Sequence, residues 1–295
     1  MPDADVDERD WVSAHAFYHG DLDELLADAV WPLVDELTAT GSIRTGFFLR
    51  YWEGGPHIRL RVLPATGPNQ VRETITTRLG GYLAAHPSED RLDQRAYAEL
   101  ARSFAAREPL GSYEKTLHPN NTVAFIPYRR EHRRFGPAMA AVERHFAESS
   151  AVVRALLAKR PRQRASIGYS LIVLAGLVAE PDRAILAASW ERFGDYYRQE
   201  AHDLDLDADY RREGARYLAL TRRLRTAAGR LDGSGSDAPL AQWGRSIRAL
   251  REHTGHDVID ICAHLACNRL GLFPRDEAIL RHHAMRSIRR LETEE

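Results

Sequence analysis

The sequence predicts an α+β protein, in which a small N-terminal mixed α/β lobe with antiparallel strands is followed by a helical lobe. Strand-type runs occur only in the first part of the chain, whereas from residue 137 onward apolar residues recur at intervals of three and four, as in amphipathic helices. The chain has 295 residues, 44% of them hydrophobic and 28% charged, which is enough to bury a full core. We expect a single domain over residues 1–295, with lobes of 1–136 and 137–295.

The first lobe is predicted to combine a hairpin with helices. A short apolar run from Trp11 leads into LDELLADAVWPLVDELTA, whose leucines and valines are spaced as in an amphipathic helix, and Gly41 ends this helix. Two β-type runs, 46–53 and 57–64, are joined by Gly-Gly-Pro, which predicts a hairpin or a tight strand connection. The lobe is completed by helices near 70–86 and 92–106 and by a strand at 122–128.

The second lobe is predicted to be almost entirely helical. Gly and Pro residues separate several of its amphipathic segments. The segment 231–240, LDGSGSDAPL, is rich in Gly, Ser and Asp, which predicts a surface loop. Helices are expected at 137–160, 164–179, 182–200, 208–229, 239–254, 256–270 and 275–293.

The charge and hydropathy patterns exclude several classes of protein. With 41 basic and 42 acidic residues, the formal net charge of -1 provides no overall field that would draw the chain to nucleic acid or to a membrane. The Arg-rich segment around 211–230 is interpreted as the solvated face of an amphipathic helix. The acidic N-terminus has no apolar run, and no stretch of about 18 apolar residues occurs, so we expect a cytoplasmic protein.

No cofactor is expected. Neither G-x-G-x-x-G nor G-x-x-x-x-G-K-[ST] occurs, so a nucleotide has no visible phosphate-binding loop. The histidines and cysteines between residues 253 and 267 are scattered around a predicted helix and include no C-x-x-C pair, which argues against zinc. Cys262 and Cys267 lie roughly 140° apart around that helix, and a disulfide between them is not expected.

The run HIRLRV at 57–62 is the first candidate site. Strict alternation places His57, Arg59 and Arg61 on one face of a strand and the apolar residues on the other. Neighbouring guanidiniums repel each other unless an anion or an acidic side chain lies between them. The pattern therefore indicates either an anion-binding face or a solvated face with Glu or Asp opposite.

Two further clusters are candidates. YRREHRRFG at 128–136 packs five basic residues around Glu131 where a strand leads into a helix, and there Arg134 is expected to point inward; the alternative is a solvated turn. In the apolar helix at 256–270, Asp260, His264 and Asn268 recur at intervals of four and form a polar stripe. Such a stripe must find partners, and Asp260 could orient His264 for proton transfer; the alternative is a core histidine with a structural hydrogen bond.

Taken in order along the chain, these motifs resemble the C-terminal elimination domain of class I lantibiotic dehydratases, also called the thiopeptide-type bacteriocin biosynthesis domain, in a standalone form. The resemblance covers most of the chain. Phe135 and Pro137 depart from the Tyr and second Gly that are usual in the family, which changes local shape more than chemistry. The matching segments are FFLRYWEGGPHIRLR (47–61), YRREHRRFG (128–136), VERHFAESS (142–150) and HLACNRL (264–270).

The resemblance implies a lyase that removes glutamate from glutamylated Ser or Thr residues of a peptide and leaves dehydroalanine or dehydrobutyrine. Residue types associated with elimination in the family are matched by Arg59, Arg61, Arg134 and His264. Contacts to the substrate are expected from other members of the same motifs, namely Arg50, His57, Asn268 and Arg269.

The chemistry of these residue types fits the implied reaction. Fixed guanidiniums would bind the departing glutamate and stabilise the negative charge on its oxygen. His264, oriented by Asp260, would take the α-proton or donate a proton to the leaving group, and the sequence does not decide between the two roles. All four catalytic candidates are expected to share one pocket.

The resemblance also implies partners. The expected substrate is a ribosomally made precursor peptide with a leader, and a separate glutamyl-tRNA-dependent enzyme is expected to glutamylate it, because 295 residues cannot hold that domain as well. Contact with a membrane or directly with nucleic acid is not expected. The sequence does not fix the oligomeric state, and a homodimer is compatible with it.

Two other functions are compatible with the same motifs. The first is a thiopeptide pyridine synthase, which catalyses a formal [4+2] cycloaddition and releases the leader. Retention of all four catalytic candidates favours elimination over this alternative. The second is a non-catalytic subunit that holds the leader peptide, as an added strand at a sheet edge.

Overall fold

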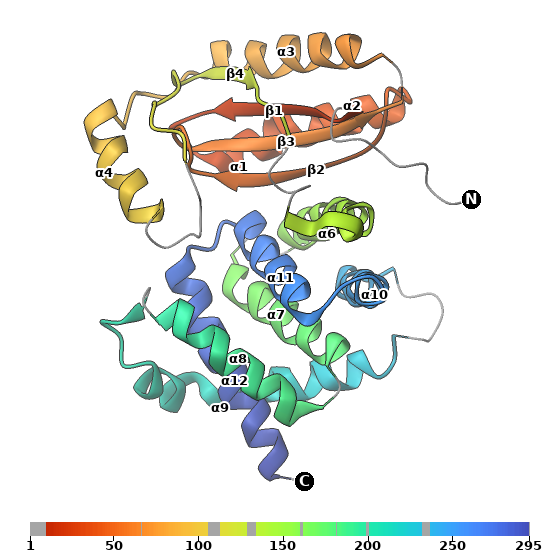
Figure 1. Ribbon diagram of the computed structural model, residues 1–295, viewed down its shortest axis with the longest axis vertical. Coiled ribbons are helices and arrows are strands. Elements are labelled where there is room, and N and C mark those ends of the chain that lie inside the picture. Colours follow the sequence, from red (N-terminus) through yellow and green to blue (C-terminus); the bar gives the residue numbers. More distant parts are fainter. Residues whose placement is uncertain are drawn as a thin grey trace. The chain divides into compact units, whose positions relative to one another are not determined.

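The computed structural model describes residues 10–65, 67–105, 113–128, 134–159, 162–180, 182–198, 201–231 and 237–294. The chain divides into two compact units, Met1–Gly136 and Pro137–Glu295. The described part of the first unit contains strands and helices, and that of the second contains helices (Figure 1). The predicted fold class, a mixed α/β lobe followed by a helical lobe, is confirmed.

The first unit is built on a four-stranded antiparallel sheet with the strand order β2-β3-β1-β4 (Figure 1). The predicted hairpin is confirmed, because β2 pairs with β3 in a register that places Phe47 opposite Arg61. Gly54 and Gly55, in the connection, have φ angles of 84° and 112°, which L side chains rarely adopt. The strands are β1 (Val12–Phe17), β2 (Ile43–Tyr51), β3 (His57–Pro64) and β4 (Thr122–Phe125).

Strand β1 lies in the middle of the sheet, paired with β3 on one side and β4 on the other. The sequence indicates only a short apolar run in this segment, because VSAHAF holds two alanines and few of the residues that favour strands. All six of its residues are buried, so packing on both sides compensates for the weak intrinsic preference. Strand β4 ends at Phe125 rather than at the predicted residue 128, and Pro127, just beyond, has no N–H to donate to a ladder.

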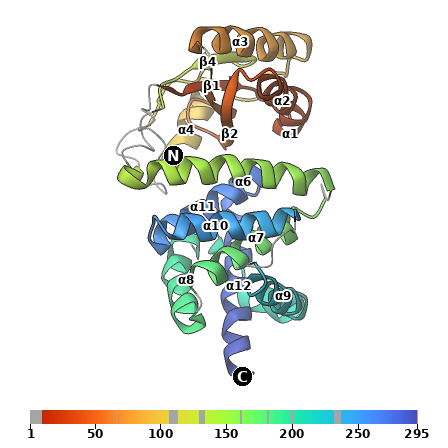
Figure 2. The same ribbon diagram turned by 90° about the vertical axis from the view of Figure 1, so that its right-hand side faces the viewer.

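Helices cover one face of this sheet. Leu60 and Ile58 of β3 belong to the same buried apolar cluster as Leu33, Val71 and Ile75 of the helices. Figure 2 shows α1, α2 and α3 against the strands of this unit. The helical segments are α1 (Leu22–Leu25), a π-helical turn (Leu26–Val30), α2 (Trp31–Ala39), α3 (Pro68–Ala85) and α4 (Gln94–Ala105).

The first predicted helix is interrupted by the π-helical turn. Pro32, in the first turn of α2, has no N–H to donate to a carbonyl of the preceding turn. A wider turn just before it accommodates this missing bond while the chain continues in the same helical direction.

The second unit contains helices close to the predicted positions. The helix α9 begins two residues before its predicted start, because Asp205 caps it by accepting a hydrogen bond from the Ala208 amide at 2.8 Å. Within this unit α11 packs against α7, and α12 packs against α8 and α9 (Figure 1). The helices are α6 (Met139–Lys159), α7 (Arg164–Ala179), α8 (Arg183–Arg198), α9 (Leu206–Ala228), α10 (Pro239–Arg251), α11 (His256–Leu270) and α12 (Pro274–Thr293).

In the described part of the chain, no helix combines the length and apolar character needed to cross a membrane.

Candidate functional site

The second face of the sheet carries the His57-Arg59-Arg61 motif. As the alternation predicts, Ile58, Leu60 and Val62 belong to the apolar core on the opposite face. The register of β1 and β3 pairs three residues of β1 with this motif, which the sequence analysis could not foresee because β1 was not predicted. The pairs are Ser13 with Arg61, His15 with Arg59 and Phe17 with His57.

Arg59 is held by three groups of its own unit. Its Nη2 donates to Oε2 of Glu53 at 3.1 Å, and its Nε donates to Nε2 of His57 at 3.2 Å. The guanidinium carbon lies 3.5 Å from the centroid of the Tyr51 ring. The other Glu53 oxygen accepts the backbone N–H of Glu114 at 2.7 Å, so Glu53 connects Arg59 to the loop that follows α4. Arg59 is therefore fixed in position before any ligand binds.

His57 is a neutral imidazole that accepts a hydrogen bond from Arg59. Its side chain is fully buried, and its Nδ1 lies 2.7 Å from the carbonyl oxygen of Gly55, to which it can only donate. Burial and the nearby Arg59 charge lower the pKa of His57 well below its ordinary value. The ring therefore carries its proton on Nδ1 and accepts from Arg59 at Nε2, an arrangement that suits positioning of Arg59 better than the predicted contact with substrate.

His15 extends this arrangement on β1. Its ring stacks on that of His57 with centroids 4.8 Å apart, and its Nε2 lies 3.4 Å from the Ser13 hydroxyl. Burial, together with His57, lowers the pKa of His15. The sheet face thus combines two cationic guanidiniums with two neutral imidazoles.

Arg61 brings the first two sequence motifs together. Its side chain is 3% exposed, and its guanidinium carbon lies 4.0 Å from the ring centroid of Tyr128 and 5.8 Å from that of Phe47. Tyr128 is the first residue of the YRREHRRFG motif, of which residues 129–133 lie outside the described residues. Trp11 packs edge-on against both aromatic rings.

Two arginines predicted for this site lie elsewhere in the first unit. Arg134 is exposed, with its guanidinium 5.7 Å from the ring of Phe135, so the expectation that it points inward is wrong. Phe135 is buried instead, because the apolar ring takes the inward position of that helical turn. Arg50 pairs across the strands with Ile58 and forms an ion pair with Asp23 of α1, which places it on the helix-covered face.

In the second unit, His264 is bound to a buried carboxylate. Its Nδ1 lies 2.7 Å from Oε2 of Glu277 on α12. The other Glu277 oxygen accepts from Nε of Arg281 at 2.7 Å, and Nη1 of Arg281 donates to Oδ1 of Asp260 at 2.5 Å. Glu277, Arg281 and Asp260 are 1%, 3% and 5% exposed, whereas the His264 side chain is 37% exposed. The partly exposed His264 is thus hydrogen-bonded to a buried ionic network formed by Glu277, Arg281 and Asp260.

Glu277 and Arg281 were not predicted as site residues from the sequence. Asp260 was predicted to orient His264, but Asp260 accepts hydrogen bonds from Arg281 instead. Through hydrogen bonds, Asp260 is connected to His264 by way of Arg281 and Glu277. Asp260 is four residues before His264 on the same helix, which made it the nearest candidate in sequence, whereas Glu277 is on the next helix. The signal that could have found them is the Glu-x-x-x-Arg spacing on α12, which places both charges on one side of a helix.

The electrostatics of the pair favour charge separation. Burial opposes a charge on His264, but the Glu277 carboxylate outweighs this effect, so the pKa of His264 is raised from its ordinary value. Burial also opposes the charge on Glu277, yet His264 and Arg281 lower its pKa to about 2. Both shifts favour an imidazolium–carboxylate pair.

The two remaining predicted contacts on α11 differ in exposure. Asn268 is partly buried, on the same stripe as His264. Arg269 is fully buried; its Nη1 donates to the Ser149 hydroxyl at 3.2 Å and its guanidinium lies 5.2 Å from the Phe146 ring. Arg269 thus joins two sequence motifs inside the helical unit, which favours a structural role over the predicted contact with substrate.

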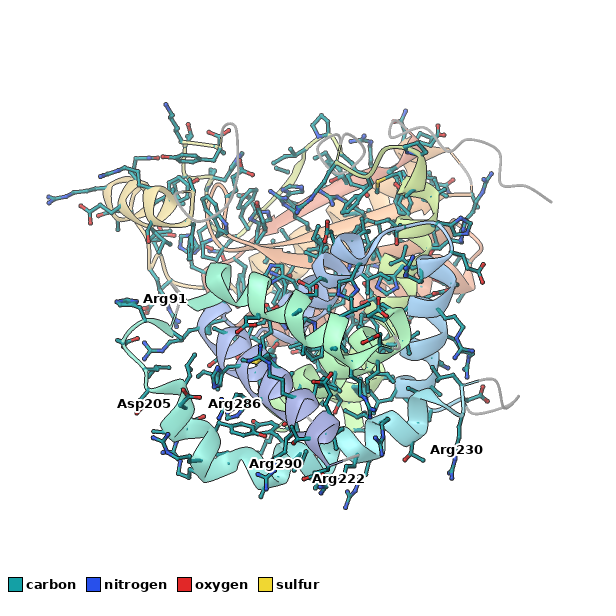
Figure 3. All side chains as sticks on the ribbon, turned by 60° about the horizontal axis from the view of Figure 1, so that its bottom comes forward. Arg91, Asp205, Arg222, Arg230, Arg286 and Arg290 are labelled. Atoms are coloured by element: carbon teal, nitrogen blue, oxygen red, sulfur yellow. The ribbon has the colours of Figure 1, made fainter. Side chains whose placement is uncertain are left out.

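The exposed arginines of α9 and α12 are largely paired with acids. Arg222 forms an ion pair with Glu294, and Arg286 lies 3.7 Å from Asp207. Figure 3 labels Arg222 on α9, Arg286 and Arg290 on α12, and Asp205, which caps the start of α9. Such exposed pairs support the interpretation of residues 211–230 as a solvated face.

Metal-binding residue types do not cluster in the described part of the chain. No group of three or more His, Cys, Asp or Glu side chains there is arranged to hold a metal ion. Cys262 and Cys267 are buried free thiols. Burial raises the pKa of Cys267 well above its ordinary value, so this thiol is uncharged beside the ionic network.

Replacing Glu53 by Gln should lower the stability of the first unit. The change keeps the shape of the side chain but leaves Arg59 without its carboxylate, and we expect the free energy of unfolding to fall by about 1–3 kcal/mol. Urea denaturation followed by circular dichroism measures the effect. Glu73→Gln, an exposed change on α3, is the control and should leave the midpoint unchanged. Equal midpoints for both variants would show that Glu53 does not hold Arg59.

Comparisons with known proteins agree on the fold. A family model described as "Lantibiotic biosynthesis dehydratase C-term" matches residues 11–288. No curated protein sequence matches the chain. Among solved structures, the pyridine synthase TbtD from thiomuracin biosynthesis has a TM-score of 0.78 at 22% identity, over 97% of this chain and 99% of TbtD. TsrL has a TM-score of 0.63 at 17% identity, over 96% of this chain and 95% of its own.

A larger enzyme contains the same fold as one part. The tRNA-dependent lantibiotic dehydratase MibB from Microbispora sp. 107891 has a TM-score of 0.62 at 17% identity. The similarity covers 100% of this chain and 29% of MibB. The chain therefore spans less than a third of that dehydratase.

Proposed function

Because the chain belongs to the family of lantibiotic biosynthesis dehydratase C-terminal domains, we propose that it removes glutamate from glutamylated Ser and Thr residues of a precursor peptide. In this β-elimination a base takes the α-proton, the electrons of that C–H bond form the Cα=Cβ double bond, and the Cβ–O bond breaks. Its electron pair leaves with glutamate as a carboxylate. The product is a dehydroalanine or dehydrobutyrine residue.

The observation that carries this proposal is the contact between His264 and Glu277. An imidazole with one nitrogen on a buried carboxylate and a partly exposed side chain is a common arrangement for acid–base and electrostatic catalysis. With Nδ1 directed at Glu277, a substrate would meet Nε2. The reaction needs such a group, because it removes one proton and releases one anion.

Arg59 and Arg61 support the same reaction through their charge. A departing glutamate gains negative charge at the oxygen that leaves, and preorganised guanidiniums stabilise that charge without having to reorganise. Arg59 is held in position by hydrogen bonds to Glu53 and His57. Arg61 is held by its packing against aromatic rings. The Glu53 carboxylate compensates part of the Arg59 charge.

The proposed reaction requires a partner enzyme. MibB is described as a tRNA-dependent dehydratase, and this chain is similar to only 29% of it. We infer that a glutamyl-tRNA-dependent activity outside these 295 residues glutamylates the leader-bearing precursor before this chain acts on it.

One observation favours a second candidate function. TbtD, a pyridine synthase, matches this chain over almost the whole of both chains, whereas MibB matches it with a smaller part. A pyridine synthase would act on a peptide that is already dehydrated, by a formal [4+2] cycloaddition with loss of the leader. The partly exposed His264, bound to Glu277, would serve that reaction as well.

Two substrates distinguish these functions. Purified chain is mixed with a glutamylated peptide in one reaction and with a linear peptide containing dehydroalanines in another, and both are followed by mass spectrometry. We expect loss of glutamate in the first and no change in the second. A ring product with release of the leader in the second would assign the pyridine synthase activity instead, and inertness in both would indicate a leader-binding subunit.

Replacing Arg61 by Ala should let the glutamylated peptide accumulate. Loss of one preorganised donor to a developing anion reduces the rate by about 100–1,000-fold. The measurement is the single-turnover rate of glutamate release, with Arg44→Ala, an exposed change on the same sheet, as the control. Parent-like rates for both variants would remove Arg61 from the proposed site.

A further inference from the structure

The buried network around His264 has an unbalanced set of permanent charges. Glu277 and Asp260 contribute two carboxylates, and Arg281 contributes one guanidinium that bonds to both of them. With a neutral His264, three buried side chains would carry a net charge of one negative unit. Because isolated charge is costly to bury, these three side chains gain from one further proton at His264, which is bonded to Glu277.

The geometry decides where this proton goes. Nδ1 of His264 faces the Glu277 oxygen at 2.7 Å, so Nδ1 bears a proton in either charge state. The additional proton must therefore be on Nε2. An imidazolium formed in this way is a donor at both nitrogens, with Nδ1 satisfied by Glu277.

We propose that His264 rests as an imidazolium held by Glu277, Arg281 and Asp260, and that it acts as a hydrogen-bond donor to an oxygen that gains negative charge in the reaction, rather than as the base. The second half of this statement rests on the proposed elimination, in which the departing carboxylate is such an oxygen. No proton needs to pass to or from His264 in the step, and the α-proton passes to a water molecule of the solvent. Glu277 and Arg281 are then positioning residues.

Among the described residues, the charged groups that act most strongly on His264 keep this balance in favour of the imidazolium. The groups that act on His264 are Asp260 on its own helix and Glu277 and Arg281 on α12; their net effect, against burial, is to raise the pKa of His264. The nearby thiol of Cys267 is held uncharged by burial, which raises its pKa.

Helices α7, α6 and α10 also pack against α11 and bring charged or polar groups to it. Arg164 of α7 donates to the Leu270 carbonyl at the C-terminal end of α11. From α6, Ser149 accepts from Arg269. Arg251, at the end of the neighbouring helix α10, donates to the carbonyls of Ala179 and Thr254. In the described part of the unit these contacts lie on backbone carbonyls or on Arg269 rather than on His264.

Nuclear magnetic resonance of the full chain tests the charge state directly. The chain is labelled at histidine with ¹³C and ¹⁵N, and the His264 signals are assigned by their loss in His264→Gln. In the parent we expect His264 to titrate above its ordinary value of 6.5 and to carry its proton on Nδ1 once neutral. In Glu277→Gln its pKa should fall by about 1–3 units, because an opposite charge has been removed.

Glu292→Gln is the matched control, since it removes a carboxylate from the same helix and should not shift His264. Should Glu277→Gln fail to fold, Asp260→Asn removes the other carboxylate and should lower the pKa of His264 in the same direction. A His264 that titrates below its ordinary value in the parent, or that does not respond to either variant, would overturn the inference.

The pH dependence of glutamate release tests the role of His264. A donor that must be charged predicts that the rate falls as the pH rises through the His264 pKa, and that this fall moves to lower pH in Glu277→Gln. A rate that rises through the same pKa would instead identify His264 as the base. If His264 is charged but His264→Gln eliminates glutamate at the parent rate, the charge state stands and the proposed function of this residue fails.

Discussion

Glutamine in place of His264 should lower the rate of dehydropeptide formation by about 100–1,000-fold. Glutamine can still accept or donate a hydrogen bond near Glu277, but it cannot carry a positive charge. The loss should therefore appear in the rate at saturating peptide more than in the peptide concentration needed for half-maximal rate. Single-turnover mass spectrometry of a purified glutamylated peptide measures both.

His253→Gln is the control for this variant. His253 is exposed just beyond the end of α10, so its replacement should leave the rate unchanged. The overall fold of both variants is checked by circular dichroism. A His264→Gln protein that is folded and fully active would show that the contact with Glu277 is structural.

Methionine in place of Arg281 should lower the free energy of unfolding by about 3–5 kcal/mol. Methionine fills a similar volume but leaves Glu277 and Asp260 buried without the cation that bonds to both. Breaking a buried ionic network from its centre costs more than removing an outer member, because two carboxylates lose their partner at once. Guanidinium denaturation of the full chain, followed by fluorescence and circular dichroism, measures the change.

Arg275→Met supplies the comparison for this experiment. Arg275 is on the same helix and forms an exposed ion pair with Asp203, and such pairs contribute at most about 1 kcal/mol. Adding Asp260→Asn to Arg281→Met should recover part of the lost stability, since one of the two orphaned charges is then removed. If Arg281→Met and Arg275→Met were equally stable, the network would not hold the helical unit together.

The helical unit could be predicted from the sequence because its signals are local. Apolar residues at intervals of three and four, with Gly or Pro between segments, define α7 and α11 almost to the residue. Strand β1 could not be predicted in this way. Its residues are held by pairing with strands that come much later in the chain, and alanine and serine carry no strand signal of their own.

In the candidate site, too, the features set by local sequence could be predicted, whereas contacts between distant segments could not. The alternation in β3 was sufficient to place Arg59 and Arg61 on one face, because side chains on a strand alternate strictly. The partners of these residues were not visible, since Glu53 and Tyr128 are brought to them by a turn and by a separate segment. Arg134 was expected to point inward because it lies between the charge run and Phe135-Gly136, whereas the neighbouring apolar ring of Phe135 takes the buried position.

The short connection between α11 and α12 has a consequence for recognising relatives of this protein. Gly271 ends α11 in the left-handed conformation with φ of 75°, and α12 begins at Pro274. An inserted residue there would rotate α12 by about 100° and carry Glu277 away from His264. The four polar residues are thus locked into one linear pattern, Asp-x3-His-x12-Glu-x3-Arg. Homologues that keep this pattern without a gap should share the charged histidine. Those that lose the glutamate at the position of Glu277 should use another group in place of the histidine as the charged donor.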